Sequence, residues 1–352
     1  MSSWYCSREA VKRAAGIDGG DRDFVVDRLI ETASRILDRL TRRYFIPRTE
    51  TRYYPWPPLQ ASRSHILWLD QDLISVTTLQ TQAQDTSPTI ISSSDYFLEP
   101  INTGPPYNRI EIDLSSSAAW EAGDTPQRSI SVLGSWGYDN ETEGGGTVAS
   151  GLASSAAATS FVCSDGSRIN VGNTLLIESE QLFVSERTSA ALAAILIDGA
   201  LTADKSEVSV TVDTGHSLHV GEVILVGSER MYVEVAGTTV LTVIRAYDGS
   251  VLAAHANDTA VHVFRTLTVE RGVNGTTAAT HANATAISVY TPPLEIQTLC
   301  IAEAIAAYHQ ERSGWGREIG SGEGQREWSG RALDDLRKRV QKIYRRARMA
   351  VV

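Results

Sequence analysis

The hydrophobic positions near the N-terminus repeat with the spacing of a helix. Between residues 23 and 44, apolar side chains recur at positions i, i+3, i+4 and i+7, which is typical of a helix with one buried face. A shorter helix is expected before it, at residues 8–15, because Ser7 suits the N-cap position and Gly16 suits the left-handed position after the last turn. The chain therefore begins with two predicted helices.

A different pattern follows between residues 49 and 138. Short runs rich in branched and aromatic residues alternate with clusters of turn-forming residues, which predicts strands. Residues 141–147 (ETEGGGT) then lead into an Ala/Ser-rich stretch that ends near Ser160. Such a composition buries too little apolar surface to order itself. We therefore predict a linker and a domain boundary at residues 140–159.

Residues 160–290 contain internal repeats. Residues 241–264 align without gaps on residues 267–290, and half of the aligned positions are identical. Residues 171–184 resemble residues 220–233 in the same way. One arrangement that fits is nested: a unit that begins at 160–188 is interrupted by a complete unit at about 208–264 and is closed by 265–290. The pattern predicts an all-β insert of small barrel or sandwich type.

Two further helices are expected after the repeats. Pro292 and Pro293 end an extended segment, and proline is tolerated in a first helical turn but not inside a helix. The helix that follows, at residues 294–308, is apolar almost all round, which favours burial in a core or between subunits. A last helix begins near Ser329, and its apolar positions form the narrow seam that is typical of coiled coils.

The length, charge and cysteine content of the chain restrict the classes of protein to which it can belong. The 352 residues suffice for two domains, and the net charge is −10. Residues 331–352 carry eight Lys or Arg and two Asp, so this segment is +6 and the remainder is −16. Three widely spaced cysteines argue against a disulfide framework and a zinc site, and fit a reducing cytoplasm. No signal peptide is evident, and the longest apolar run is far below the ~20 residues of a membrane span.

The sequence contains few residues that are candidates for catalysis or metal binding. His216 and His219 form an HxxH pair without further ligands nearby, so a turn or surface role is favoured over a metal site. His255 and His281 recur at equivalent repeat positions, which favours a repeated turn contact over catalysis. Four glutamates are predicted to lie on solvated faces and not to form carboxylate pairs: Glu178, Glu180, Glu229 and Glu234. We therefore predict no enzymatic activity, no metal and no cofactor.

Several segments resemble one known family when they are taken in order. They are LTRRYF at residues 40–45, DYFLEP at 95–100 with RIEI at 109–112, GSWGY at 134–138 and PPLEI at 292–296. Together they resemble the head–tail connector (adaptor) proteins of tailed bacteriophages. The resemblance covers roughly residues 5–139 and 291–352, and the β insert is a departure from the shorter members.

The resemblance implies an α+β fold. We expect a helical connector core made of residues 1–139, with its short-stranded β region, and residues 291–352, with residues 160–290 as an inserted all-β barrel or sandwich-like domain. It further implies a ring, typically a dodecamer, under the portal protein in the neck of the virion, assembled in the host cytoplasm. Such a ring extends the DNA channel and offers a platform for the stopper or the tail. DNA would pass without specific recognition, since an acidic wall repels phosphate, and no membrane is involved.

The resemblance also suggests two sets of contact residues. The expected interface between copies is Val26, Leu29, Ile30, Leu299, Ile301, Ile305 and Tyr308. The expected portal or partner surface is the last helix with Leu333, Leu336, Val340, Ile343, Arg337, Arg339, Arg345, Arg346 and Arg348. The basic residues of that helix also fit a solvated face or direct DNA contact. An alternative function is a phage surface binding module, in which the β insert recognises a carbohydrate or a capsid or host surface.

Overall fold

The computed structural model describes residues 3–56, 64–313, 318–319, 326–327 and 331–346. In this part of the chain there are eighteen strands and four α-helices. Strands take 36% of the chain and helices 21%. The prediction of a helical connector core is therefore wrong, because the chain is mostly β and has only four α-helices in its described part. The helical patterns at the two ends were read correctly, but the strands between them set the fold class.

The described residues fall into two compact units. Unit 1 comprises Met1–Ile36, Thr142–Val273 and Thr277–Arg337. Unit 2 comprises Leu37–Glu141, Asn274–Thr276 and Lys338–Val352. Each unit is described by itself below.

Unit 1 contains a closed six-stranded barrel, here called the first barrel. Its strands pair in the order β10-β9-β16-β7-β8-β15, and β15 pairs back with β10 to close the ring. The bounds are β7 Thr142–Ser150, β8 Ser160–Cys163, β9 Thr174–Ile177, β10 Glu180–Leu196, β15 Ala260–Glu270 and β16 Ala286–Tyr290. Its interior is filled by side chains such as Phe161, Leu175, Leu182 and Leu267, so the barrel is a packed core.

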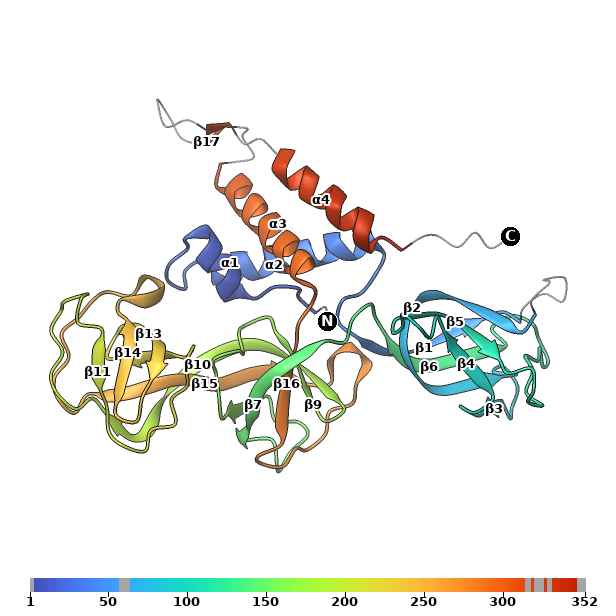
Figure 1. The fold of residues 1–352 in the computed structure, drawn as a ribbon, viewed down its shortest axis with the longest axis horizontal. Coiled ribbons are helices and arrows are strands. Elements are labelled where there is room, and N and C mark those ends of the chain that lie inside the picture. The colour runs from blue at the N-terminus through green and yellow to red at the C-terminus, as the bar shows by residue number, and fades with distance from the viewer. Residues whose placement is uncertain (1–2, 57–63, 314–317, 320–325, 328–330, 347–352) are drawn as a thin grey trace. The chain divides into compact units, whose positions relative to one another are not determined.

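A second barrel is built on the far halves of the same two long strands. From β15 the sheet continues through β12 (Val223–Val226), β13 (Glu229–Ala236), β14 (Val240–Ile244) and β11 (Ser209–Thr211). A bridge between Ile197 and Val212 brings the end of β10 beside the end of β11. Figure 1 shows β10 and β15 running from one barrel into the other. The second barrel has its own apolar core.

The strand pairing confirms the nested arrangement of the repeats. β9 and the start of β10 pair with β16 and the end of β15, which lie in residues 267–290. The intervening β12 pairs with β13 and with the start of β15. Inward side chains alternate along the whole of β15, and Val261 and Val263 enter the second core whereas Leu267 and Val269 enter the first.

Residues 142–150 lie within the predicted linker but form β7, a strand between β8 and β16. A Cβ on Gly145 would stand 2.9 Å from a methyl group of Val289, so the glycine allows the strand to lie close to the barrel core. Val148 and Leu152 are fully buried. The glycine run looked flexible because Val289 and Ile287, which pack against Gly145, lie more than a hundred residues away.

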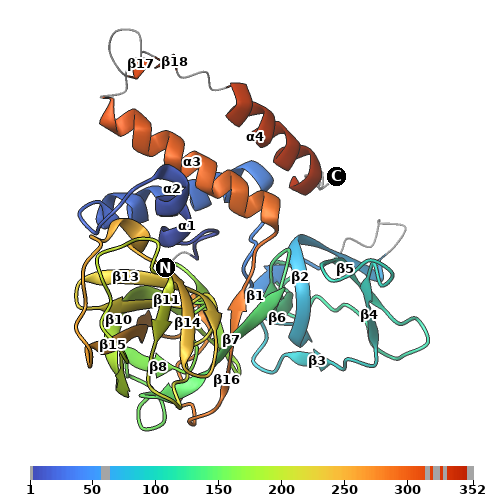
Figure 2. The same cartoon turned by 60° about the vertical axis from the view of Figure 1, so that its left-hand side comes forward.

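The helices of unit 1 pack on one another. α1 (Arg8–Ala15) begins at Ser7, whose hydroxyl accepts a bond from the Ala10 amide, and ends at the left-handed Gly16. α2 (Asp23–Thr41) and α3 (Leu294–Arg312) run antiparallel, since Arg28 meets Glu311 and Ser34 meets Cys300. Figure 2 shows α3 across α1 and α2. α3 is therefore covered in large part by helices of its own chain.

The remaining described elements, apart from the strands of unit 2, are two 3-10 helices, a hairpin and a last helix; Asn274, Gly275 and the part of the last helix from Lys338 onward belong to unit 2. The turns after β14 and β15 contain the 3-10 helices Tyr247–Gly249 and Val273–Gly275. β17 (Glu318–Ile319) and β18 (Arg326–Glu327) form a small hairpin before α4 (Arg331–Tyr344). In the part of the chain that the structure describes, no helix has the length and hydropathy needed to span a lipid bilayer.

Unit 2 is an antiparallel sheet with the order β1-β6-β2-β5-β4, and β3 pairs with β2. The bounds are β1 Arg48–Tyr54, β2 Ile66–Thr81, β3 Thr89–Ile91, β4 Tyr96–Glu99, β5 Tyr107–Ile112 and β6 Ile130–Trp136. One face is packed around Leu69, Leu73, Ile110 and Trp136. Beside the sheet, the rings of Phe45, Tyr138 and Tyr344 stand edge to face, with centroids 5.4 to 5.6 Å apart.

Candidate functional site

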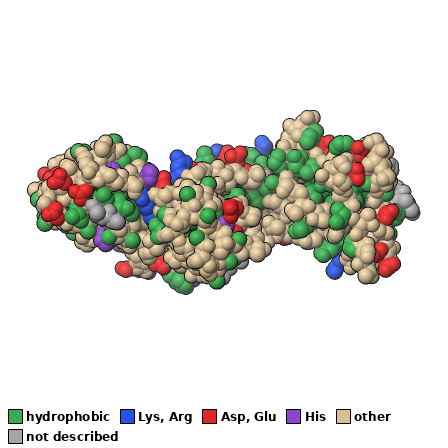
Figure 3. Space-filling model, turned by 90° about the horizontal axis from the view of Figure 1, so that it is seen from below, with side chains coloured by type: hydrophobic (Ala, Val, Ile, Leu, Met, Phe, Trp, Pro, Cys, Tyr) green, Lys and Arg blue, Asp and Glu red, His purple; other side chains and the backbone are tan. Residues whose placement is uncertain are grey.

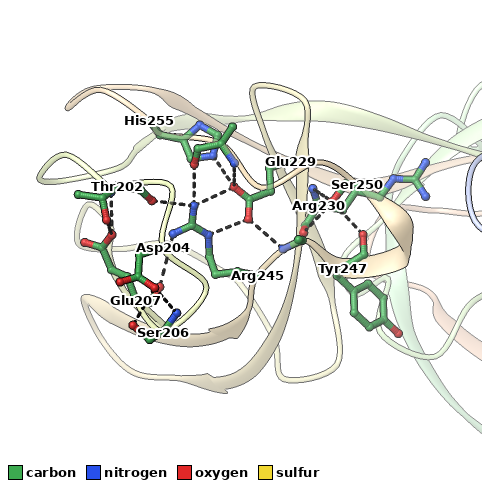
Figure 4. A network of polar contacts seen from close by, with 12 residues as sticks. Thr202, Asp204, Ser206, Glu207, Glu229, Arg230, Arg245, Tyr247, Ser250 and His255 are labelled. Atoms are coloured by element: carbon green, nitrogen blue, oxygen red, sulfur yellow. Dashed lines mark hydrogen bonds and ion pairs between the residues drawn. The ribbon is translucent and has the colours of Figure 1, made fainter.

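The most elaborate polar group in the second barrel is a buried cluster of Glu229, Arg245 and His255. Glu229 opens β13, Arg245 follows β14, and His255 lies in the loop before β15. Arg245 Nε and Nη2 donate to the two carboxylate oxygens at 2.7 and 2.8 Å, and His255 Nε2 lies 2.8 Å from Oε2. Figure 4 shows the Arg245 fork and the His255 ring directed at the carboxylate.

The first barrel contains the same cluster, built from Glu180, Arg271 and His281. Arg271 donates from Nε and Nη2 to the carboxylate at 2.7 Å each, and His281 Nε2 lies 2.8 Å from Oε2. The two backbone amides that complete each cluster are also equivalent: Gly272 and Ala279 in the first barrel, Ala246 and Ala253 in the second. The repeat of the sequence is thus a repeat of one polar structure.

These carboxylates are strongly held in the ionised form. The side chains of Glu180 and Glu229 are fully buried, and burial by itself raises a carboxyl pKa. The hydrogen bonds from arginine, histidine and backbone amides outweigh burial and lower the pKa of Glu180 and of Glu229 to about 2. In return, the Glu229 carboxylate raises the pKa of Arg245.

Each carboxylate accepts five hydrogen bonds, so it has no free position for a substrate. In the second barrel, Oε1 accepts from Arg245 and Ala246, and Oε2 accepts from Arg245, Ala253 and His255. The arginine also donates to the Ala253 carbonyl at 2.7 Å. The cluster therefore ties the loop between β14 and β15 to the start of β13, which is a structural task.

The structure corrects the prediction for two of the four glutamates. Glu180 and Glu229 are buried, whereas Glu234 is exposed and the Glu178 side chain is 61% exposed. The expectation of solvated faces overlooked the arginine partners. For His255 and His281, the equivalent contact that the repeats predicted is confirmed. The missed signal was available, because Glu, Arg and His all recur at aligned positions.

A related ion pair joins the two barrels. Arg265, on the shared strand β15, donates to both carboxylate oxygens of Glu222 at 2.7 and 2.8 Å. The Gly166 amide of the first barrel donates to the same carboxylate at 2.9 Å. Arg265 also donates to the Ser217 hydroxyl at 3.0 Å. Residues of both barrels thus share one buried charge.

His216 and His219 do not form a metal site in the described structure. His216 Nε2 lies 2.8 Å from the Gly237 carbonyl, and its Nδ1 accepts from the Leu218 amide, so both ring nitrogens serve the local turn. The His219 backbone amide donates to Glu222, and its side chain is exposed. Within the described residues no group of three or more His, Cys, Asp or Glu is arranged to hold a metal ion.

A cleft of about 240 Å³ lies between α1 and the two barrels. Its cationic side chains mostly have acceptors: Arg8 pairs with Asp27, and Arg187 donates to the carbonyls of Gly166 and Phe264 at 2.8 and 2.9 Å. Arg230 pairs with Asp248 across the same cleft. α1 is also fixed to the first barrel by the Arg8 amide, which donates to the Val171 carbonyl. The charges of this cleft therefore serve mainly to dock the helix.

The residues predicted for the interface between copies are largely used inside the chain. Five of them are buried in the single chain: Val26, Leu29, Ile30, Leu299 and Tyr308. Ile301 and Ile305 are half-buried. Two exposed side chains were missed, Phe24 at 81% and Leu294 at 74%. Phe24 lies off the buried face of α2, and Leu294 begins α3, where no preceding turn covers it.

Only part of the predicted partner surface on α4 is exposed. Val340 is buried, Leu333 and Leu336 are half-buried, and Ile343 is 55% exposed. Two arginines are occupied within the chain: Arg337 by Glu303 and Asp334, and Arg346 by Asp72. Arg339 and Arg345 are exposed. Arg348 lies outside the described residues. The seam and the basic residues are thus only partly available to another protein.

Comparisons of the chain with known protein families, with curated proteins and with solved structures found no match.

Proposed function

We propose that this chain is a structural protein of the tailed-bacteriophage virion, a head–tail connector that forms a ring under the portal, extends the DNA channel and carries the stopper or tail. One observation carries the proposal: segments with the connector resemblance lie far apart in the sequence but pack together. Phe45 and Tyr138 end the LTRRYF and GSWGY segments, Tyr344 lies in the C-terminal part that the resemblance covers, and the three rings form one aromatic cluster. The DYFLEP and RIEI segments pair as β4 and β5.

The saturated polar clusters support a structural role. Each buried carboxylate of the two barrels already accepts five bonds, and the barrels are filled by apolar side chains. A general acid or base must reach a substrate proton, and these groups are enclosed by their own donors. The most developed polar chemistry of the described residues is thus directed inward, at holding loops in place.

The exposed ends of the helix pair suit a ring. α2 and α3 run antiparallel, so Phe24 at the start of α2 and Leu294 at the start of α3 stand at opposite ends of the pair. A ring needs a heterologous contact, in which two different surfaces of neighbouring copies meet. We assign Phe24 and Leu294 to the two sides of that contact, in place of the residues that are buried within the chain.

The free part of α4 suits a partner such as the portal. Ile343 is exposed between the exposed cations Arg339, Lys342 and Arg345. An apolar side chain with a basic rim fits an acidic protein surface with a matching pocket. Arg337 and Arg346 contribute less, because their guanidinium groups already bind carboxylates of the same chain.

The charge distribution fits DNA that passes without being held. The chain carries 42 Asp and Glu against 32 Lys and Arg. On the face drawn in Figure 3, the Lys and Arg side chains lie in small separate groups. Tight binding of duplex DNA requires several cations along the phosphate backbone. An acidic wall instead repels phosphate over about a Debye length, ~8 Å at physiological salt.

Imaging of the full chain mixed with purified portal tests the proposal. We expect rings of this protein on one face of the portal, and we expect Phe24→Asp with Leu294→Asp to abolish ring formation while leaving the circular dichroism spectrum unchanged. Glu234→Gln, an exposed change in the second barrel, is the control. Rings that form equally well with the double variant would refute the proposed contact, and a protein that never binds the portal would refute the connector role.

A second candidate is a surface-binding module, and one observation favours it. Four aliphatic side chains are exposed on neighbouring positions of the second barrel: Val208, Val235, Val240 and Ile244. Val235 pairs with the residue between Val240 and Ile244, and Val208 accepts a bond from the adjacent Val243 amide. Exposed aliphatic patches mark protein contacts, so a capsid or host protein fits better than a glycan. Unchanged binding to phage and host surfaces in Val240→Asp would count against it.

A further inference from the structure

Two of the three cysteines meet inside unit 1. Cys6 precedes α1 and Cys300 lies in α3, so 294 residues separate them, yet their Sγ atoms are 3.3 Å apart. Both are free thiols in this structure, and their exposed fractions are 7% and 0%. The wide spacing in the sequence, which argued against disulfides, is thus removed by the fold.

The surroundings hold the two thiols against each other. Ser34 Oγ of α2 lies 3.5 Å from Cys300 Sγ, and the same hydroxyl accepts a bond from the Tyr5 amide at 3.1 Å. Tyr5 is the residue before Cys6, so this bond fixes the segment that carries the first thiol. No side chain separates the two sulfur atoms at this distance.

The third cysteine offers a contrast within the same molecule. Cys163 ends β8 and is fully buried in the first barrel. Its Sγ lies 3.3 Å from the Arg265 carbonyl oxygen, and burial raises the pKa of its thiol to about 11. Its hydrogen-bond partner is a carbonyl oxygen and not a second sulfur atom, so it is not placed to form an intramolecular disulfide.

We propose that Cys6 and Cys300 are an oxidation site, at which a small disulfide such as oxidised glutathione converts the two thiols into an intramolecular disulfide. An S–S bond is about 2.05 Å long, so the sulfur atoms have to approach each other by about 1 Å. Cys6 lies outside the regular elements, so a small shift of the N-terminal segment brings the two sulfur atoms together.

The reaction proceeds in two exchange steps. Cys6 is the more exposed of the two, and its hydrogen bond to Cys300 and its burial raise the pKa of its thiol, so it reacts when the N-terminal segment opens to water. It then loses its proton and attacks one sulfur of glutathione disulfide. This forms a mixed disulfide at Cys6 and releases one glutathione thiolate, which takes up the proton. The Cys300 thiolate then attacks the Cys6 sulfur and displaces the second glutathione, which takes up the second proton. Two cysteines are oxidised and one glutathione disulfide is reduced to two thiols.

The disulfide would link the N-terminal segment to α3. Cross-linking two points so far apart in the chain removes many conformations of the unfolded state, so the oxidised protein is the more stable form. Glutathione keeps thiols reduced in a cytoplasm, whereas an extracellular medium permits disulfides. We therefore expect the two thiols to stay reduced in a cytoplasm and to form the disulfide in an oxidising medium. This inference does not depend on the proposed neck role.

Mass mapping of the full chain tests the site. The reduced protein is incubated with a mixture of oxidised and reduced glutathione, and a second sample is refolded from urea in the same mixture so that access to the buried thiols is not limiting. Both are digested without reductant. We expect a linked peptide pair that contains Cys6 and Cys300 and lacks two hydrogens, Cys163 unmodified, and a higher thermal midpoint than that of the reduced protein.

Two variants make the test specific. Cys163→Ala should form the same linked pair, whereas Cys300→Ser should stop at the mixed disulfide, with one glutathione on Cys6. The proposal is overturned if Cys6 and Cys300 remain reduced in both the native and the refolded sample. It is overturned equally if Cys163 is found in the disulfide in place of either cysteine.

Discussion

The two barrels of unit 1 are built on one plan, but they differ at one position beside the buried histidine. In the first barrel, His281 Nδ1 lies 2.8 Å from the carboxylate of Glu178. The aligned position in the second barrel is Gly227, and there is no carboxylate at this point beside His255. Both residues have a left-handed backbone, with φ of 54° and 57°. The duplication thus kept the Glu–Arg–His cluster and the turn but changed the outer partner.

This difference shows which contacts the two barrels have in common and which one is variable. The buried part of the cluster is the same in both barrels, down to the backbone amides that donate to the carboxylate. The variable partner is mostly exposed, and exposed ion pairs contribute little to stability. We therefore expect the two barrels to respond alike to changes in the buried cluster and differently to changes at the outer position.

The largest effect is expected from loss of the buried charge. Glu229→Gln leaves the Arg245 guanidinium without its counter-charge, and breaking a buried pair in this way costs ~3–5 kcal/mol. Glu180→Gln should have a similar effect through Arg271. Urea unfolding followed by circular dichroism measures both. The exposed Glu234→Gln, in the same strand as Glu229, is the control and should stay within ~0.5 kcal/mol. If only one of the two variants shows a large loss in free energy of unfolding, then the duplicated clusters are not energetically equivalent.

Arg265 is the next test, because it belongs to both barrels. Arg265→Met removes the charge that binds Glu222 and leaves this buried carboxylate with two backbone donors, from Gly166 and His219. Leaving a buried carboxylate without its cation lowers the free energy of unfolding by ~3 kcal/mol. Hydrogen exchange should show faster opening of strands in both barrels. Protection lost in only one barrel would contradict the joining role of this pair.

Much of the helical structure could be read from the sequence. The helix at residues 8–15 begins and ends as the capping residues indicated, and the apolar face of α2 is buried. Local signals suffice for such elements, since caps and periodicity involve neighbouring residues. The nested repeats were also readable, because self-similarity locates equivalent strands without knowledge of their partners.

The missed features depend on distant partners. Glu180 was read as solvated because Arg271, its counter-ion, is 91 residues away. The glycines of β7 looked like a linker because Val289, against which Gly145 packs, lies on the last strand of the barrel. The helix at residues 294–308 was correctly predicted to be apolar and covered, but its pattern left open whether a core or a neighbouring copy would cover it.

Acid should weaken both barrels in the same pH range. The carboxyl pKa of Glu180 and Glu229 is about 2 in the folded chain, against an ordinary value of 4.5. Below pH 4.5 the unfolded chain binds protons that the folded chain does not, so protons favour unfolding. The stabilisation is thus complete above about pH 4.5 and is lost as the pH falls toward 2. Urea midpoints measured across this range should decrease, and the double variant Glu180→Gln with Glu229→Gln should show a shallower decrease.

A smaller effect is expected from the histidines. His255→Phe removes one of five donors to Glu229, and a hydrogen bond of this kind contributes ~1 kcal/mol. His281→Phe loses the equivalent bond and also the contact with Glu178, so its urea midpoint should fall slightly further. The exposed His219→Phe is the control. Equal losses at His255 and His281 would mean that the outer carboxylate contributes nothing measurable.

The smallest effect is expected at the position where the barrels differ. Glu178→Gly makes the first barrel like the second: it removes an exposed partner of His281, worth ~0.5 kcal/mol, and relieves a left-handed backbone that costs a non-glycine residue ~1 kcal/mol. The two terms nearly cancel, so the urea midpoint should change little. Gly227→Glu should be mildly destabilising, because it adds the backbone cost at a place with room for the side chain. If Glu178→Gly instead destabilises as much as His281→Phe, then Glu178 is a full member of the first cluster, and the two barrels have diverged in their buried chemistry as well as at their surface.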